Sequence, residues 1–204
     1  MTDVLKDKSG ILIEGHIKIY DPKSNEIFVD KRNAIHYENM SVALARSIAN
    51  QGQGWIYEMS FGNGGTNVDP TGIITYLTPN STGTNASLYN QTYSKVVDDR
   101  SINNVDPVRN KIDIRHVSGT NYTDVLVTCL LDYGEPSGQD AFDTASSAAS
   151  LYVFDELGLR GWNPEGTGDL LTHVIFHPVQ KSLNRLVQID YTVRIQSLSG
   201  LVEE

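Results

Sequence analysis

The chain has 204 residues and a formal net charge of −9, from 16 Lys plus Arg against 25 Asp plus Glu. Proteins that wrap nucleic acid, and amphipathic helices that lie on membranes, take much of their affinity from Lys and Arg. The acidic balance therefore argues against both classes of protein. The length and a hydrophobic content of 39% predict one folded domain with its own core.

Cys129 is the only cysteine, so an intrachain disulfide and a cysteine-rich zinc site are both excluded. It lies in an apolar run and is interpreted as a small buried residue. No stretch reaches the ~18 apolar residues of a membrane span, and the first residues lack the apolar core of a signal peptide. We expect the protein to be made and kept in a reducing, soluble compartment.

The first structured element is predicted to be a β-hairpin. Residues 1–10 are polar and predict a loose N-terminal arm. Residues 11–20 alternate between apolar and polar side chains from Ile13 onward, which is typical of a half-buried strand. A turn containing Pro22 follows, and residues 26–30 form the expected partner strand.

One short helix is predicted over residues 40–50. Its apolar stripe has the i, i+4, i+8 spacing of one helix face and consists of Met40, Leu44 and Ile48. Asn39 or Ser41 is the expected N-terminal cap. Such a short, alanine-rich helix is expected to pack against one end or face of a sheet.

A strand over residues 55–61 runs into a glycine cluster at residues 62–65. A dinucleotide or phosphate loop would need these glycines to open a helix, so that backbone N–H groups meet the phosphates. Here a turn-forming segment through Pro70 follows, and no Lys-Ser or Lys-Thr pair completes a P-loop. We therefore interpret the cluster as the exit of a strand into a polar loop, and expect no nucleotide cofactor.

The remaining sequence predicts further strands separated by long polar loops. The loops cover residues 63–90 and 134–150, and loops of this length are usually functional or take part in interactions. A strand from residue 151 is expected to end at a turn marked by Gly158, before a loop over residues 160–169. The other expected strands are residues 92–97, 111–117, 122–132, 170–177 and 185–196, the last of which alternates.

The fold class that follows is mainly β, an antiparallel β-sandwich or flattened barrel with one short α-helix and long loops. A single domain is expected to span residues 11–196, and residues 197–204 form a C-terminal tail.

Metal binding is disfavoured by spacing. His173 and His177 would share one strand face about 13 Å apart, too far for two ligands of one ion. The five histidines are expected on the surface or in loops. Asp98, Asp99 and Asp106 lack the spacing of an EF-hand, so a bound cation is not expected.

Catalysis is also disfavoured. Asp155 and Glu156 are adjacent on a predicted strand, so their side chains point to opposite faces and cannot flank one substrate. Glu156 is expected to satisfy backbone donors at the strand end. No G-x-S-x-G segment poses a serine as a nucleophile. We expect a protein that is not an enzyme and binds no cofactor or metal.

The order of these parts resembles virion structural proteins of tailed bacteriophages, of the kind that form necks, tails, baseplates and fibre attachments. The matching segments are residues 33–41, 59–65, 88–97, 155–159 and 176–181, and they are distributed over most of the chain between residues 11 and 196. The resemblance implies a non-enzymatic β-sandwich that assembles as a symmetric ring or collar. Its expected partners are copies of itself and other virion proteins, in particles assembled in the host cytoplasm.

Three aromatic residues are candidate anchors at subunit interfaces: Trp55, Tyr76 and Trp162. Ordinary packing within the core or loops is an equally good interpretation of each. Residues 63–90 are expected to touch another protein chain. The alternative function is a carbohydrate- or receptor-binding module of a tail fibre or spike, in which loop aromatics would stack on sugars.

Overall fold

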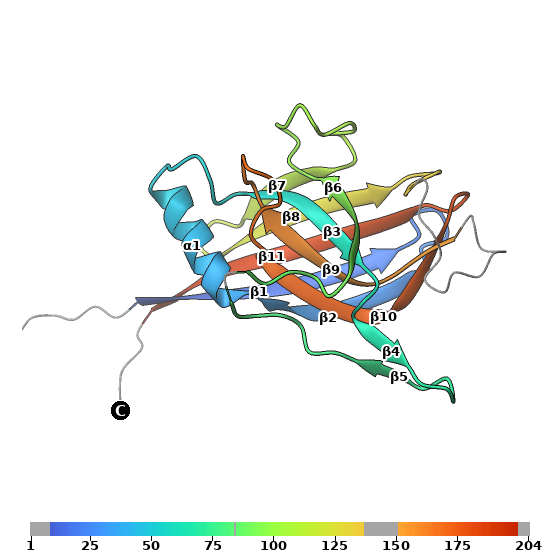
Figure 1. Ribbon diagram of the computed structural model, residues 1–204. Helices are drawn as coiled ribbons and strands as arrows, with labels where there is room; N and C mark the ends of the chain where they lie inside the picture. Colours follow the sequence, from blue (N-terminus) through green and yellow to red (C-terminus); the bar gives the residue numbers. More distant parts are fainter. Residues whose placement is uncertain (1–8, 84, 137–150, 200–204) are drawn as a thin grey trace, which may run out of the picture.

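A computed structural model describes residues 9–83, 85–136 and 151–199 (Figure 1). Its elements in chain order are β1 (Ser9–Tyr20), β2 (Ile27–Ile35), α1 (Tyr37–Ile48), β3 (Ile56–Gly62), β4 (Thr66–Val68), β5 (Ile74–Tyr76), β6 (Gln91–Val96), β7 (Lys111–His116), β8 (Tyr122–Leu131), β9 (Leu151–Gly161), β10 (Thr172–Ser182) and β11 (Val187–Ser199). Two residues at the end of the predicted arm and three at the start of the predicted tail thus belong to strands. Most of the predicted loop over residues 134–150 lies outside the described residues.

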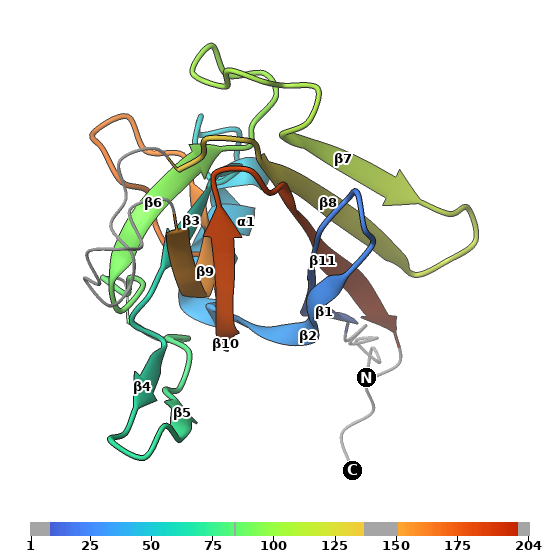
Figure 2. The same cartoon turned by 90° about the vertical axis from the view of Figure 1, so that its right-hand side faces the viewer.

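Nine strands form one curled antiparallel sheet in the order β6-β3-β9-β10-β2-β1-β11-β8-β7. Figure 2 shows its two halves facing each other across the core. The halves are joined where β10 pairs with β2, at only two residue pairs, Thr172 with Ile35 and His173 with Ala34. The predicted fold class, a mainly β antiparallel sandwich or flattened barrel with one short helix, is confirmed.

Alternation along the strands places the apolar residues in the core. In β1 and β11, Ile17 lies opposite Tyr191 and Ile19 opposite Ile189, and all four are buried. The same parity continues into β8, where Val127, Cys129 and Leu131 are buried on the core face. The predicted faces of residues 13–19 and 187–195 are confirmed.

The helix differs from its prediction in start, cap and buried face. It begins at Tyr37, because the His36 ring Nδ1 accepts the N–H of Asn39 at 3.2 Å and caps the first turn. The predicted cap Asn39 instead donates its side-chain amide to the Leu170 carbonyl at 2.9 Å. Met40 is buried against Leu171, as expected, but Ile48 is 84% exposed. The helix covers only the end of the curled sheet, so its last turn extends past the core (Figure 1).

Several strands are longer than predicted, including β2, which continues to Ile35, and both β9 and β10. β9 does not turn at Gly158 but continues to Gly161. A side chain at residue 158 would lie 2.4 Å from the Thr172 carbonyl, so the glycine allows close strand packing and does not mark a turn. β10 continues through Pro178, which has no N–H to donate, and its pairing with β9 is irregular between Ile175 and Val179.

Lys181, near the end of β10, is a buried cation with neutral hydrogen-bond acceptors. Its ammonium donates to the carbonyls of Asp132 and Ser182, each at 2.9 Å. Burial lowers the pKa of Lys181 from 10.5 to about 8, although the nearby Glu135 and Asp132 oppose the shift and Lys95 adds to it.

A pH-dependent stability follows from this shift. Between pH 8 and 10.5 the unfolded chain retains a proton on Lys181 that the folded protein has lost, so the stability contributed by this group rises with pH. We expect the free energy of unfolding of the wild type to increase relative to Lys181→Met between pH 7 and pH 10. Urea unfolding of both proteins across this range measures the difference, and a constant difference would contradict the assignment.

Candidate assembly surface

Two adjacent carboxylates in the middle of β9 bind the glycine cluster that follows β3. Asp155 accepts the backbone N–H groups of Gly65 and Thr66, each at 2.9 Å, and also the Thr66 hydroxyl. Glu156 accepts the N–H of Gly64 at 3.1 Å. The backbone donors that would face a phosphate in a nucleotide site are therefore bonded to carboxylates of the chain itself.

Glu156 also fixes the far end of the segment over residues 63–90. It accepts the N–H groups of Tyr89 at 3.0 Å and Asn90 at 2.8 Å. The fourth donor is His173, whose Nε2 lies 2.9 Å from the Glu156 carboxylate. Because the Nδ1 of His173 accepts the N–H of Asn80 at 2.8 Å, the ring proton lies on Nε2 and points toward Glu156. Glu156 satisfies backbone donors, as predicted, but from within β9 and not at its end.

Glycines are required at positions 62 and 64 because the chain there passes close to Glu156 of β9 and to the backbone of Asn90. A side chain at Gly62 would lie 2.5 Å from the Glu156 carboxylate and 2.6 Å from the Asn90 carbonyl. At Gly64 it would lie 2.8 Å from the backbone nitrogen of Asn90. Only a residue without a Cβ allows the chain to pass this close to β9.

The pKa values of the two carboxyl groups shift in opposite directions. Neither is exposed to solvent. Burial raises the pKa of Asp155, and the hydrogen bonds from Thr66 and Gly65 only partly offset this effect. Burial acts in the same direction on Glu156, but the combined donors from His173, Asn90, Tyr89 and Gly64 hold its pKa below the usual range. Glu156 is therefore the ionised anchor of the segment.

The histidine prediction was wrong for two residues. His36 and His173 are fully buried, His36 as the helix cap and His173 as the partner of Glu156. The side chains of His16, His116 and His177 are exposed, as expected. Burial follows from hydrogen-bond partners that are distant in sequence, and no local pattern at these positions indicates it.

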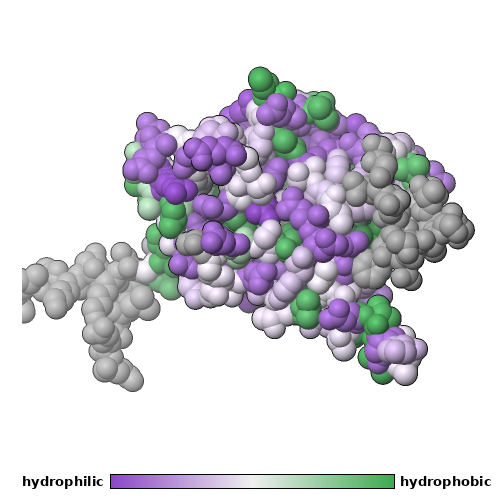
Figure 3. Space-filling model, in the orientation of Figure 1, coloured by the Kyte–Doolittle hydropathy of each residue, from purple (hydrophilic) through white to green (hydrophobic). Residues whose placement is uncertain are grey.

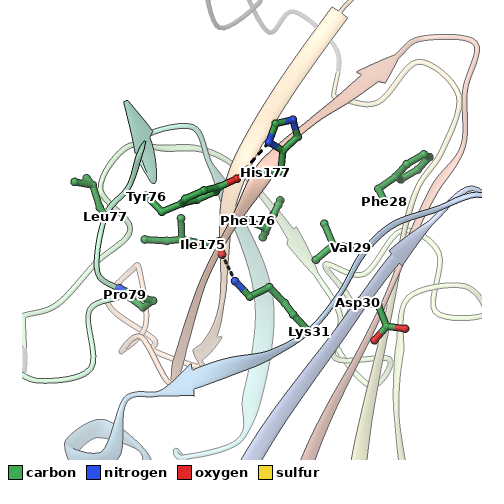
Figure 4. Close-up of a pocket in the computed structure, with 10 residues that line it drawn as sticks. All are labelled: Phe28, Val29, Asp30, Lys31, Tyr76, Leu77, Pro79, Ile175, Phe176 and His177. Atoms are coloured by element: carbon green, nitrogen blue, oxygen red, sulfur yellow. Dashed lines mark hydrogen bonds between the residues drawn. The ribbon is translucent and has the colours of Figure 1, made fainter. Parts of the chain in front are cut away.

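The anchored segment carries the β4–β5 hairpin, which projects from the sheet (Figure 2). Leu77, just after β5, donates its N–H to the Gly65 carbonyl at 2.9 Å. The Tyr76 hydroxyl lies 3.3 Å from Nδ1 of His177 on β10, as Figure 4 shows. The hairpin nevertheless leaves three large apolar side chains at least 54% exposed, namely Val68, Ile73 and Tyr76.

A pocket of about 370 Å³ lies between the base of the hairpin and the diverging strands β2 and β10 (Figure 4). Lys31 of β2 bridges it, because its ammonium donates to the Ile175 carbonyl at 2.8 Å. The walls combine apolar side chains, including Phe28 and Phe176, with the polar Lys31 and His177. The pocket lies where the two halves of the sheet separate.

The loop over residues 98–110, between β6 and β7, is a second projection. The amide of the buried Asn104 donates to the Asp98 and Asn110 carbonyls at 3.2 and 2.8 Å. The fully buried Asn110 accepts the N–H of Leu130 at 2.9 Å. Three apolar residues of this well-bonded loop are each at least 79% exposed, namely Ile102, Val105 and Val108. Figure 3 shows apolar side chains on this projection, at the top, and on the hairpin, at the lower right.

This second projection was not predicted from the sequence. A signal was present, because apolar residues at a spacing of three interrupt a run rich in Asn, Asp and Pro. The acidic residues there serve local structure: Asp98 accepts from the backbone and guanidinium of Arg100, and Asp106 from Arg109.

The three predicted anchors lie on two separate surfaces. Trp55 and Trp162 are half-buried and stack on each other, with ring centroids 5.2 Å apart and planes 15° from parallel. Together with Tyr57, Asp98 and Arg100 they line a pocket of about 450 Å³. Tyr76 is on the hairpin and is mostly exposed. The structure thus brings the two tryptophans together and leaves Tyr76 as the most accessible of the three.

Within residues 9–83, 85–136 and 151–199, no three His, Cys, Asp or Glu side chains meet in an arrangement that could hold a metal ion. The helix of this described part is not long and apolar enough to cross a membrane. Comparison with protein-family models, with curated proteins and with solved structures found no match.

Proposed function

We propose that this chain is a non-enzymatic structural protein that assembles with other protein chains through its two apolar projections. The observation that carries the proposal is the combination of exposed apolar side chains with rigid anchoring. The projections present Val68, Ile73 and Tyr76 on one side and the loop over residues 98–110 on the other. Exposed apolar clusters on soluble proteins commonly mark interaction sites.

The rigid anchoring of both projections favours a binding role for their exposed apolar side chains. Ordering a flexible loop at an interface costs free energy, which a loop fixed beforehand does not lose. The carboxylates of Asp155 and Glu156 fix the base of the hairpin, and Asn104 and Asn110 fix the loop. In both projections these hydrogen bonds hold the backbone in place, while the apolar side chains remain exposed to solvent.

The resemblance to tailed-phage virion proteins makes the proposal specific. We propose a ring or collar subunit of a neck, tail or baseplate, present in the assembled virion and bound to copies of itself and to other virion proteins. Mass spectrometry of purified particles tests this placement. Absence of the protein from particles would contradict the virion role. Self-assembly is tested separately, by the variant described next.

A triple variant tests the hairpin contact: Val68→Ser, Ile73→Ser and Tyr76→Ser. We expect it to lower the mass of the assembly measured by light scattering after size-exclusion chromatography, because it removes the apolar contacts of the hairpin. Ile48→Ser is the control, since Ile48 is even more exposed, at 84%, but lies on α1. An unchanged mass in the triple variant, or an equal loss in the control, would contradict the proposal.

One observation favours the alternative, a carbohydrate- or receptor-binding module. The pocket beside Trp162 combines aromatic rings with Asp98 and Arg100, a mixture suited to sugar hydroxyl groups. However, the stacking of Trp55 on Trp162 occupies one face of each ring. Glycan-array binding that is lost in Trp162→Ala would establish this alternative, and no binding by the wild type would count against it.

A further inference from the structure

β7 forms one edge of the nine-stranded sheet. It pairs with β8 from Lys111 opposite Thr128 to His116 opposite Thr123. The N–H of Ile112 is directed toward Asp99 at 3.5 Å, on the side away from β8. Because alternate residues of a strand direct their backbone groups to the same side, those of Ile114 also face the free edge. Figure 2 shows β7 at the outer margin of its half of the sheet.

Two of the three side chains on the inner face of this edge, Ile112 and Ile114, are apolar, and the third is His116. Ile114 lies opposite Val125 on the face that forms the core elsewhere, yet it is 74% exposed. The free backbone groups of Ile114 and its uncovered apolar side chain make this edge a template for pairing with another chain.

We propose that β7 pairs antiparallel with the β7 of a second copy of this chain, about a two-fold axis at Ile114. In this register the two Ile114 side chains face each other. Asp113 of each copy lies opposite Arg115 of the other, which gives two ion pairs on the outer face. Opposite charges directly across neighbouring strands stabilise antiparallel pairing. A two-fold contact uses the same patch on both copies, as most homodimers do.

Charge selects this register over its neighbours. Centring the axis on Asp113 would place two aspartates face to face and Lys111 opposite Arg115. Centring it on Arg115 would place two arginines face to face. A centre at Ile112 would run the partner past the first residue of β7, Lys111, into the loop over residues 98–110. The Ile114 register is therefore the one that uses the full strand without like charges in contact.

The Arg115 side chain is available for this contact. It is exposed, and it lies opposite Asp124 of β8. The Asp124 carboxylate, however, is held by two bonds from Arg194, at 2.7 and 2.8 Å. Edges that are protected from pairing commonly carry lysines. The sequence here instead alternates sign at Lys111, Asp113 and Arg115, which makes the edge complementary to itself.

Charge reversal tests the contact. Asp113→Arg and Arg115→Asp should each raise the dissociation constant of the dimer at least about tenfold, because both ion pairs become repulsive. An equimolar mixture of the two variants should restore the dimer, since each copy then meets an opposite charge at both positions. Sedimentation equilibrium of each variant and of the mixture measures this. All proteins carry the three hairpin serine substitutions, so the result does not depend on the hairpin contact.

Two further measurements make the result decisive. Circular dichroism of each variant confirms folding, and Asp30→Arg with Arg32→Asp repeats the same reversals at the same spacing on β2, inside the sheet. A wild-type edge that stays monomeric in the hairpin background, or a mixture that dimerises no better than its components, would overturn the inference. Equal weakening by the β2 variants would overturn it as well.

Discussion

Replacing Glu156 with alanine is expected to lower the free energy of unfolding by about 3–5 kcal/mol, because it removes the shared acceptor of four hydrogen bonds at a buried site. The substitution leaves the N–H groups of Gly64, Tyr89 and Asn90 without their acceptor, and also the ring of His173. These donors are buried or partly buried, so each loses its acceptor at a cost in desolvation. Urea unfolding measures the change.

The control for this prediction is Glu165→Ala, because Glu165 is exposed in the loop before β10. It should change stability by no more than about 0.5 kcal/mol. Hydrogen exchange should also show faster exchange at Gly64 and Asn90 in the Glu156→Ala protein. A Glu156→Ala protein as stable as the control would show that the carboxylate does not anchor the segment.

Gly62→Ala is expected to cost about 1–3 kcal/mol, the usual cost of overpacking a well-packed site. The added methyl group would lie 2.5 Å from the Glu156 carboxylate and 2.6 Å from the Asn90 carbonyl. To relieve these contacts, either the buried Glu156 carboxylate or the backbone at Asn90 would have to move. Thermal or urea unfolding detects the loss.

Gly161→Ala is the matched control, since Gly161 also ends a strand. Its added methyl group would lie 3.7 Å from the nearest atom, the Trp55 carbonyl, which is an ordinary contact. It should be neutral or slightly stabilising, because alanine restricts the unfolded chain. Equal stability of the Gly62→Ala and Gly161→Ala proteins would mean that the glycine cluster is not held against β9.

Much of the fold could be predicted because strand signals are local. The alternation of residues 13–19 and 187–195 identified both the strands and their buried faces. Short or irregular elements were missed where their structure depends on contacts that are distant in the sequence. β4 and β5 have three residues each, too few for a periodic signal. Gly158 looked like a turn residue because its packing partner, the Thr172 carbonyl, lies on another strand.

The candidate surface was predicted only in part. Tyr76 and the segment over residues 63–90 were singled out from composition, and their role in assembly stays a prediction. Trp55 and Trp162 were named singly, and their mutual stacking depends on two loops more than 100 residues apart in sequence. The loop carrying Ile102 was missed, because its rigidity comes from buried amide bonds to Asp98 and Asn110.

The sequence by itself determined that the chain is mainly β, which faces of its regular strands are buried, and that its glycine cluster does not open a helix. These properties depend on neighbours within a few residues. Only the tertiary structure decided what the cluster binds, because its partners Asp155 and Glu156 lie about 90 residues further along the chain. Burial removes water from these groups, so the amides and the carboxylates must satisfy each other. That pairing fixes the hairpin that presents Tyr76.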